Sequence, residues 1–235
     1  MSNGREMYLE YRSRFVCDLL KYHGRTKVDS IADFGCGDGR LLAALTEKLG
    51  ATHAIGVDFD ADPNRSSERI RYHRENFLDF TPDERCELVT SIQVFEHVYD
   101  PWLTRYFDAL KRACKPGGMI LVSTPNRWRP SNLVRAATLR RPAMMYPNPG
   151  VPDEEFLGHH RESSYRELAA YLDRHFSSPE WRFQVAGPAP RNTGSAGVWM
   201  INLAIYYGLW LAWRPLCVSA SHDHYAVILR RSKPG

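Results

Sequence analysis

The chain has 235 residues, of which 43% are hydrophobic and 25% are charged, with a formal net charge of +4 at pH 7. This length favours one sizeable α/β domain over two, and the apolar share is ordinary for a globular protein. So small a charge, without a long basic run, argues against a nucleic-acid-binding protein.

The first predicted element is an amphipathic helix over about residues 6–21, where apolar and charged positions alternate at helical spacing. A buried strand is predicted over 28–34, because these residues form a short apolar run. A helix over 39–49 follows, and its leucines recur with helical periodicity.

The segment Asp33-Phe34-Gly35-Cys36-Gly37-Asp38-Gly39 joins this strand to this helix. Alternating glycines let the backbone turn sharply and come close to a ligand, with the start of a helix facing it. Asp33, at the end of the strand, suits a ligand that carries a positive charge. The dinucleotide pattern G-x-G-x-x-G would need its third glycine at Arg40, so the spacing argues against NAD.

A second apolar strand, over 53–58, ends in Asp58 about 20 residues after the glycines, where an acidic side chain can hold a ribose diol. The alternative for Asp58 is a simple turn residue. Further on, the pattern predicts a short helix after Pro63, strands over 70–73, 87–92 and 118–123, and a helix over 101–114. This alternation predicts a mostly parallel sheet with helices on both faces.

Suitable polar side chains stand at four successive strand ends, where ligands of such sheets bind. They are Asp33, Asp58, Asn76 and Gln93. Together with Arg74-Glu75-Asn76-Phe77, Val94-Phe95-Glu96-His97-Val98 and Lys115-Pro116-Gly117-Gly118, these segments resemble the motifs of class I S-adenosylmethionine (SAM)-dependent methyltransferases, including small-molecule enzymes of the UbiG type. The resemblance covers about residues 28–190.

This resemblance implies a Rossmann-like α/β fold with a mostly parallel seven-stranded sheet, as a single domain over 1–235 that binds S-adenosyl-L-methionine. It implies that Asp33 lies near the methionyl end, that Asp58 binds the ribose, and that Asn76 meets the adenine. Arg14 on the leading helix would contact the cofactor's carboxylate or stay solvated. The implied cofactor-binding residues are Arg14, Asp33, Gly35, Cys36, Gly37, Gly39, Asp58, Phe59, Asn76, Phe77 and Gln93.

The second half of the chain begins with a long insertion over about 125–160, which we expect to form a lid over the acceptor site. A helix over 165–175 follows, with Ser163 or Ser164 as its N-cap. The strands at about 181–186 and 225–229 resemble the antiparallel hairpin that closes a methyltransferase sheet.

An apolar, aromatic helical insertion is predicted between these two strands, over about 193–216, and residues 193–213 carry no charge. The run is long enough to cross a membrane, but one span would separate the two paired strands. Three interpretations remain: a helix buried against the sheet or against a second copy in a homodimer, a wall of the acceptor pocket, or an interfacial helix on a membrane surface.

Candidate catalytic residues are the histidines His97, His159 and His160. A hydroxyl acceptor must lose its proton, and histidine is the commonest general base near neutral pH. Each could instead be structural or solvated, and we expect at most one of His159 and His160 to be catalytic. These bases slightly favour O- over N-methylation of a small-molecule acceptor, as in secondary metabolism.

A metal-assisted mechanism is an alternative. Glu96, His97 and His160 resemble part of the metal set of Hen1-type RNA 2′-O-methyltransferases. Those enzymes carry a second glutamate where this chain has Gln93, a poorer ligand for a hard cation, so we predict no metal. The small net charge also weakens the case for RNA. Two further alternatives are a membrane-associated quinone or lipid O-methyltransferase and a protein that binds SAM or a partner without turnover.

The five cysteines are odd in number and form no C-x-x-C pair. They predict reduced thiols rather than a disulfide framework or a zinc ribbon. The first six residues lack the apolar core of a signal peptide. Together these features predict a cytoplasmic location.

Overall fold

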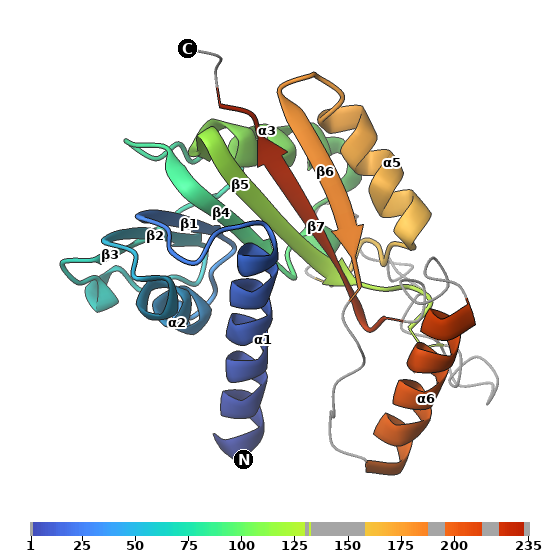
Figure 1. Cartoon of the computed structure of the whole chain (residues 1–235). Helices are drawn as coiled ribbons and strands as arrows, with labels where there is room; N and C mark the ends of the chain where they lie inside the picture. Colours follow the sequence, from blue (N-terminus) through green and yellow to red (C-terminus); the bar gives the residue numbers. More distant parts are fainter. Residues whose placement is uncertain (1, 130–131, 133–157, 188–195, 213–220, 233–235) are drawn as a thin grey trace. The chain divides into compact units, whose positions relative to one another are not determined.

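The computed structural model describes residues 2–129, 132, 158–187, 196–212 and 221–232 (Figure 1). The chain divides into two compact units. The first comprises Met1–Ile92, Arg105–Leu121 and Leu229–Gly235, and the second comprises Gln93–Thr104 and Val122–Ile228. Most of the predicted lid over 125–160 falls outside the described residues.

The strands form one seven-stranded sheet in the order β3-β2-β1-β4-β5-β7-β6. β1 pairs in parallel with β2 and β4, and β2 pairs in parallel with β3. β7 runs opposite to β5 and β6 (Figure 1), so the predicted Rossmann-like sheet, mostly parallel with an antiparallel closing strand, is confirmed. The strands are β1 (Ser30–Phe34), β2 (His53–Asp58), β3 (Ile70–Arg74), β4 (Cys86–Ile92), β5 (Cys114–Pro125), β6 (Trp181–Ala186) and β7 (Asp223–Arg230).

The α-helices also follow the predicted order, with shifted ends. In the described part of the chain they are α1 (Ser2–Tyr22), α2 (Arg40–Leu49), α3 (Leu103–Ala113), α5 (Tyr165–His175) and α6 (Ala196–Ala212). The predicted helix over 101–114 begins later, because Pro101 lies in a 3₁₀ turn, η3 (Asp100–Trp102), that precedes α3. Two further 3₁₀ turns are η1 (Pro63–Arg65) and η2 (Phe95–His97).

In the first unit, β1 is buried along its length and α2 buries one apolar stripe. The members of that stripe, Leu42, Leu45 and Leu49, are at most 2% exposed. Spacings of three and four residues bring side chains onto one helical face, so α2 covers the sheet with that face. This packing fixes the loop between β1 and α2 at both of its ends.

In the second unit, α5 starts with a capping box. The Ser164 hydroxyl accepts a hydrogen bond from the Glu167 amide at 3.3 Å, and the Glu167 carboxylate accepts one from the Ser164 amide at 2.8 Å. Two amides that would lack partners at a helix start are thereby satisfied. Of the two predicted N-caps, Ser164 is therefore the one that the structure uses.

Candidate functional site

The loop between β1 and α2 keeps a conformation that requires glycine. Gly37 has φ of 53° and Gly39 has φ of 75°, a region that residues with a Cβ rarely adopt. The Tyr72 hydroxyl donates a hydrogen bond to the Gly39 carbonyl at 3.1 Å, and a Cβ added at Gly39 would overlap the Tyr72 ring. The backbone of this loop is therefore held close to its neighbours.

Asp33 stands at the end of β1 and is only 2% exposed. Its carboxylate accepts a hydrogen bond of 2.6 Å from the Thr90 hydroxyl of β4. Burial is the main cause that raises the pKa of Asp33, the bond from Thr90 lowers it, and the nearby Asp58 raises it, with a net pKa of about 6. The ionised form is therefore stabilised by any positive charge that comes close to it.

Asp58 connects the end of β2 to the glycine loop. One of its carboxylate oxygens accepts a hydrogen bond from the Gly37 amide at 2.9 Å, and the other accepts one from the Asp60 amide at 2.9 Å. The predicted ribose-binding acid and the predicted glycine loop are therefore in direct contact.

The adenine-side candidates follow β3. The Asn76 side chain accepts a hydrogen bond from the Leu78 amide at 3.0 Å and so shapes its own loop. The ring centroid of Phe77 lies 6.3 Å from that of Phe59 and 6.4 Å from that of Tyr106. Phe59 is 61% exposed, which leaves an apolar surface beside the end of β2.

The remaining cofactor candidates are placed differently. Arg14 is exposed and forms an ion pair of 2.5 Å with Glu10, one turn away on α1. Cys36 is buried, and burial raises the pKa of its thiol far above the usual range. Gln93, which belongs to the second unit, has φ of 60°, while its amide donates to the Ser123 carbonyl at 3.0 Å. Such a conformation in a residue with a side chain is strained and typical of functional positions.

In the second unit, Glu96, His97 and His159 form a cluster of three possible ligand groups. One side-chain ligand atom from each lies within 4.8 Å of the others. The rings of His97 and His159 lie edge to face, with centroids 4.7 Å apart. A ring nitrogen of His97 also lies 3.0 Å from the Gly158 carbonyl oxygen. The structure therefore brings together two of the three predicted catalytic histidines.

Glu96 is the buried member of this cluster, at 1% exposure. Burial raises its pKa to about 7, although the charge of His159 acts to lower it. Among the described residues, one of its carboxylate oxygens has no hydrogen-bond partner. A buried carboxylate with one oxygen unpartnered among the described residues, beside two imidazoles, is suited to hold a proton or a cation.

His159 also contacts a second carboxylate, because its Nδ1 lies 3.4 Å from Glu162. Burial alone would raise the pKa of Glu162, but His159, Arg129 and Asn132 outweigh burial and lower it. His160 is placed differently. Its amide donates to the Glu96 carbonyl at 2.7 Å, and its ring centroid lies 5.6 Å from that of Tyr99.

Two buried residues of the second unit were not predicted. The Arg161 guanidinium donates to the Phe95 carbonyl at 2.7 Å, pairs with Asp100, and lies 5.0 Å from the centre of the Phe95 ring. His224 on β7 is fully buried, and among the described residues neither ring nitrogen has a hydrogen-bond partner. Burial lowers the pKa of His224 to about 4. The signals in the sequence were the His-His-Arg-Glu run before α5 and the Ser-His-Asp-His run at the start of β7.

A family model described as a methyltransferase domain matches residues 8–178. The relatives include the mitochondrial ubiquinone biosynthesis O-methyltransferase of Dictyostelium discoideum, which is 30% identical in an alignment of 147 residues that covers 50% of this chain and 44% of that protein. The trans-aconitate 2-methyltransferase of Rhizobium rhizogenes is 30% identical in an alignment of 138 residues that covers 55% of this chain and 52% of that protein. The chain thus matches about half the length of these curated relatives.

Solved structures share the fold at low sequence identity. The plantazolicin methyltransferase BpumL in complex with S-adenosylhomocysteine (SAH) is 14% identical, with a TM-score of 0.60 over 98% of this chain and 88% of that chain. The methyltransferase domain of bacterial CtHen1 is 18% identical, with a TM-score of 0.58 over 94% of this chain and 97% of that chain.

Proposed function

The chain belongs to the methyltransferase domain family, as a class I enzyme that uses SAM, and we propose that it methylates a hydroxyl group of a small-molecule acceptor. The observation that carries this proposal is the cluster of Glu96, His97 and His159. Methylation of a hydroxyl releases a proton, and this cluster offers two imidazoles beside a buried carboxyl group. An amine acceptor that is already neutral needs no such base in the displacement step.

The cofactor is held by the first unit in this proposal. Asp58 accepts hydrogen bonds from the ribose hydroxyls, and the glycine loop follows the methionyl part. This assignment is supported by the bond between Asp58 and the Gly37 amide, which fixes the carboxylate beside the loop. Phe59 and Phe77 offer apolar contact to the adenine ring, with Asn76 at its polar edge.

In the reaction, the acceptor oxygen attacks the methyl carbon, the bond from that carbon to the sulfonium sulfur breaks, and SAH leaves. The hydroxyl proton passes to His159, which then carries a positive charge. The contacts of His159 with Glu162 and Glu96 stabilise that charge. The protein otherwise orients the two reactants, an effect worth up to about 7–11 kcal/mol in well-aligned pairs.

A panel of phenols and matched anilines tests the acceptor class. With purified chain and SAM, we expect the methyl group on the phenolic oxygen, detected by mass spectrometry together with SAH. Methylation of the anilines alone would overturn the proposal of a hydroxyl acceptor. The absence of SAM binding by calorimetry would instead favour a protein that serves only a partner.

SAM affinity is expected to depend on pH through Asp33. Its pKa of about 6 means that the carboxyl group is mostly neutral at pH 5 and ionised at pH 8. Because the cationic cofactor favours the ionised form, affinity should fall about tenfold from pH 8 to pH 5. Calorimetry across this range measures the effect. Asp33→Asn should remove this dependence, and a wild-type affinity that stays constant would contradict the role of Asp33.

A second candidate is metal-assisted transfer to an RNA 2′-hydroxyl, and the same cluster favours it. One carboxylate and two imidazoles form a donor set that suits a divalent transition metal. The unpartnered, buried oxygen of Glu96 fits such a ligand role. In that case Glu96, His97 and His159 would hold the ion, which would polarise the acceptor hydroxyl. Dialysis against EDTA separates the candidates: activity persists with a histidine base, whereas a metal mechanism loses activity and regains it with Mn²⁺.

α6 supports a proposal that the chain rests on a membrane surface. Its side chains Met200, Ile201, Ile205, Tyr207 and Leu211 are 44–78% exposed, so α6 is not wholly buried against the sheet. No helix in the described part of the chain is long and apolar enough to cross a membrane. An apolar helix of this kind can lie in the interfacial layer, where aromatic side chains are also favoured.

We expect the chain to co-sediment with phosphatidylglycerol-containing vesicles. The double variant Ile201→Glu/Leu211→Glu should bind these vesicles at least about 100-fold more weakly. The reason is that each Ile or Leu side chain buried in the membrane contributes ~1.5–3 kcal/mol to binding. Tyr22→Glu places a charge at another exposed apolar position, which is 77% exposed on α1, and serves as the control. Sedimentation that is equal for all three proteins, or absent for the wild type, would refute the membrane assignment.

A further inference from the structure

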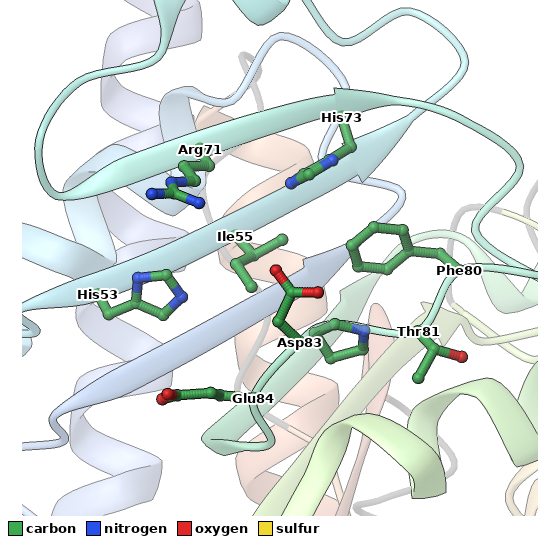
Figure 2. A pocket seen from close by; sticks show the side chains of 9 residues that line it. His53, Ile55, Arg71, His73, Phe80, Thr81, Asp83 and Glu84 are labelled. Atoms are coloured by element: carbon green, nitrogen blue, oxygen red, sulfur yellow. The ribbon is translucent and has the colours of Figure 1, made fainter.

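A cavity of about 280 Å³ lies on one face of β2 and β3 (Figure 2). Side chains alternate between the two faces of a strand, so His53 and Ile55 of β2 share a face with Arg71 and His73 of β3. Gly56 points to the opposite face, because a Cβ there would touch Leu42 of α2. The cavity therefore lies on the face of β2 and β3 that α2 leaves uncovered.

Asp58 distinguishes this cavity from the proposed cofactor site. It follows Gly56 by two positions and so shares the face of Gly56, not the face of Ile55. Its carboxylate contacts Gly37 in the glycine loop, and neither residue lines the cavity. A ligand in the cavity would therefore be a second ligand.

The cavity exists because the connection from β3 to β4 lacks a helix. Residues 75–85 contain neither helix nor strand, although parallel strands are usually joined through a crossover helix that covers the sheet. Here the segment from Phe80 to Glu84 faces the side chains that β2 and β3 present on this side of the sheet. One wall of the cavity is thus strand and the other is loop.

Phe80 fixes this loop wall. The residue is 8% exposed, and its ring centroid lies 6.1 Å from that of Phe34 and 4.9 Å from that of His73. Together with Ile55 and Pro82 it gives the cavity an apolar part. Small-molecule sites combine such apolar surface with a few polar groups in fixed places.

Opposite charges face this cavity without pairing. Arg71 extends from β3, and Asp83 and Glu84 extend from the loop (Figure 2). None of these three side chains forms a hydrogen bond or an ion pair with another residue in the described part of the chain. The guanidinium is therefore more than 4 Å from either carboxylate, and the space between them suits a molecule that carries both charges.

We propose that this cavity binds a small zwitterion, namely a free α-amino acid with an apolar side chain. The ligand carboxylate pairs with the Arg71 guanidinium, whose planar donors match a carboxylate. The ligand ammonium faces Asp83 and Glu84, and the apolar side chain packs on Phe80 and Ile55. This site does not depend on the proposed acceptor.

The test is calorimetry of the whole chain with L-leucine, in the presence of saturating SAH so that the cofactor's own amino-acid position is filled. Leucinamide lacks the carboxylate and 4-methylpentanoate lacks the ammonium. Loss of one charge-assisted pair should lower the binding affinity by a factor of at least about ten. We therefore expect both analogues to bind at least about tenfold more weakly than leucine. Arg71→Gln and Asp83→Asn should each weaken the binding of leucine to a similar extent.

Arg85→Gln is the matched control, since Arg85 follows the loop wall without lining the cavity. All variants must keep wild-type affinity for SAH, which shows that the fold and the cofactor site are intact. Failure of leucine to bind at millimolar concentration would overturn the proposal. Equal binding of 4-methylpentanoate and leucine would do the same, because it would indicate a simple anion site.

Discussion

Replacing His159 with alanine is expected to lower kcat about 10²- to 10⁴-fold, the range that loss of a general base produces. The reason is the position of His159 between Glu162, at 3.4 Å, and the buried Glu96. The variant removes the proposed proton acceptor and leaves the residues of the glycine loop untouched. SAM affinity, measured by calorimetry, should therefore stay at the wild-type value while turnover falls.

His160→Ala makes this comparison specific. The ring of His160 packs beside Tyr99 rather than joining the cluster. The fold-reduction in kcat caused by His160→Ala should therefore be smaller than that caused by His159→Ala, by a factor of at least about ten. His23→Ala, in the turn after α1, controls for removal of a histidine elsewhere. If His160→Ala proved the more damaging variant, the assignment of the base to His159 would be wrong.

Replacing Asp58 with alanine is expected to weaken SAM binding about 100-fold, or about 2.8 kcal/mol. The carboxylate is proposed to accept bonds from the ribose, and bonds to charged groups contribute ~1.5–3 kcal/mol each. It also holds the Gly37 amide at 2.9 Å, so the variant loosens the loop as well. Calorimetry with SAM and with SAH gives the two affinities.

Asp60→Ala is the matched control, because Asp60 contributes a backbone amide, not its carboxylate, to the bond with Asp58. Its SAM affinity should remain within about threefold of the wild type. Asp58→Asn refines the test, since it keeps the size of the side chain and removes its charge. Full affinity in Asp58→Ala would show that the ribose is bound elsewhere.

The sequence predicted the first unit well because its signals are local. The strand that ends in Asp33, the glycine spacing and the strand that ends in Asp58 each occupy a few adjacent residues. Parallel pairing then brings these ends to one edge of the sheet. The bond between Asp58 and Gly37 confirms that proximity. The pKa of Asp33 could not be predicted, since it depends on burial and on Thr90 of another strand.

The second unit depends on contacts between distant parts of the chain. His97 and His159 are separated by a long insertion in the sequence, and their contact cannot be predicted from hydrophobic periodicity. The sequence does not distinguish His159 from His160, because the backbone between Gly158 and Arg161 determines which ring lies beside Glu96. The burial of Glu96 in η2 and of His224 in β7 was missed because charged and polar residues are usually expected in solvent.

β3 is one of the two edge strands of the sheet, and within the described part of the chain its strand partner is β2. With a cavity rather than a helix over one face, its amides should exchange with solvent through local openings that cost less than global unfolding. Asn76 and Phe77 follow the end of this edge strand, separated from it by Glu75. We therefore expect the proposed adenine side of the cofactor site to gain order when SAM binds, so that amide exchange along β3 becomes slower in the presence of the cofactor.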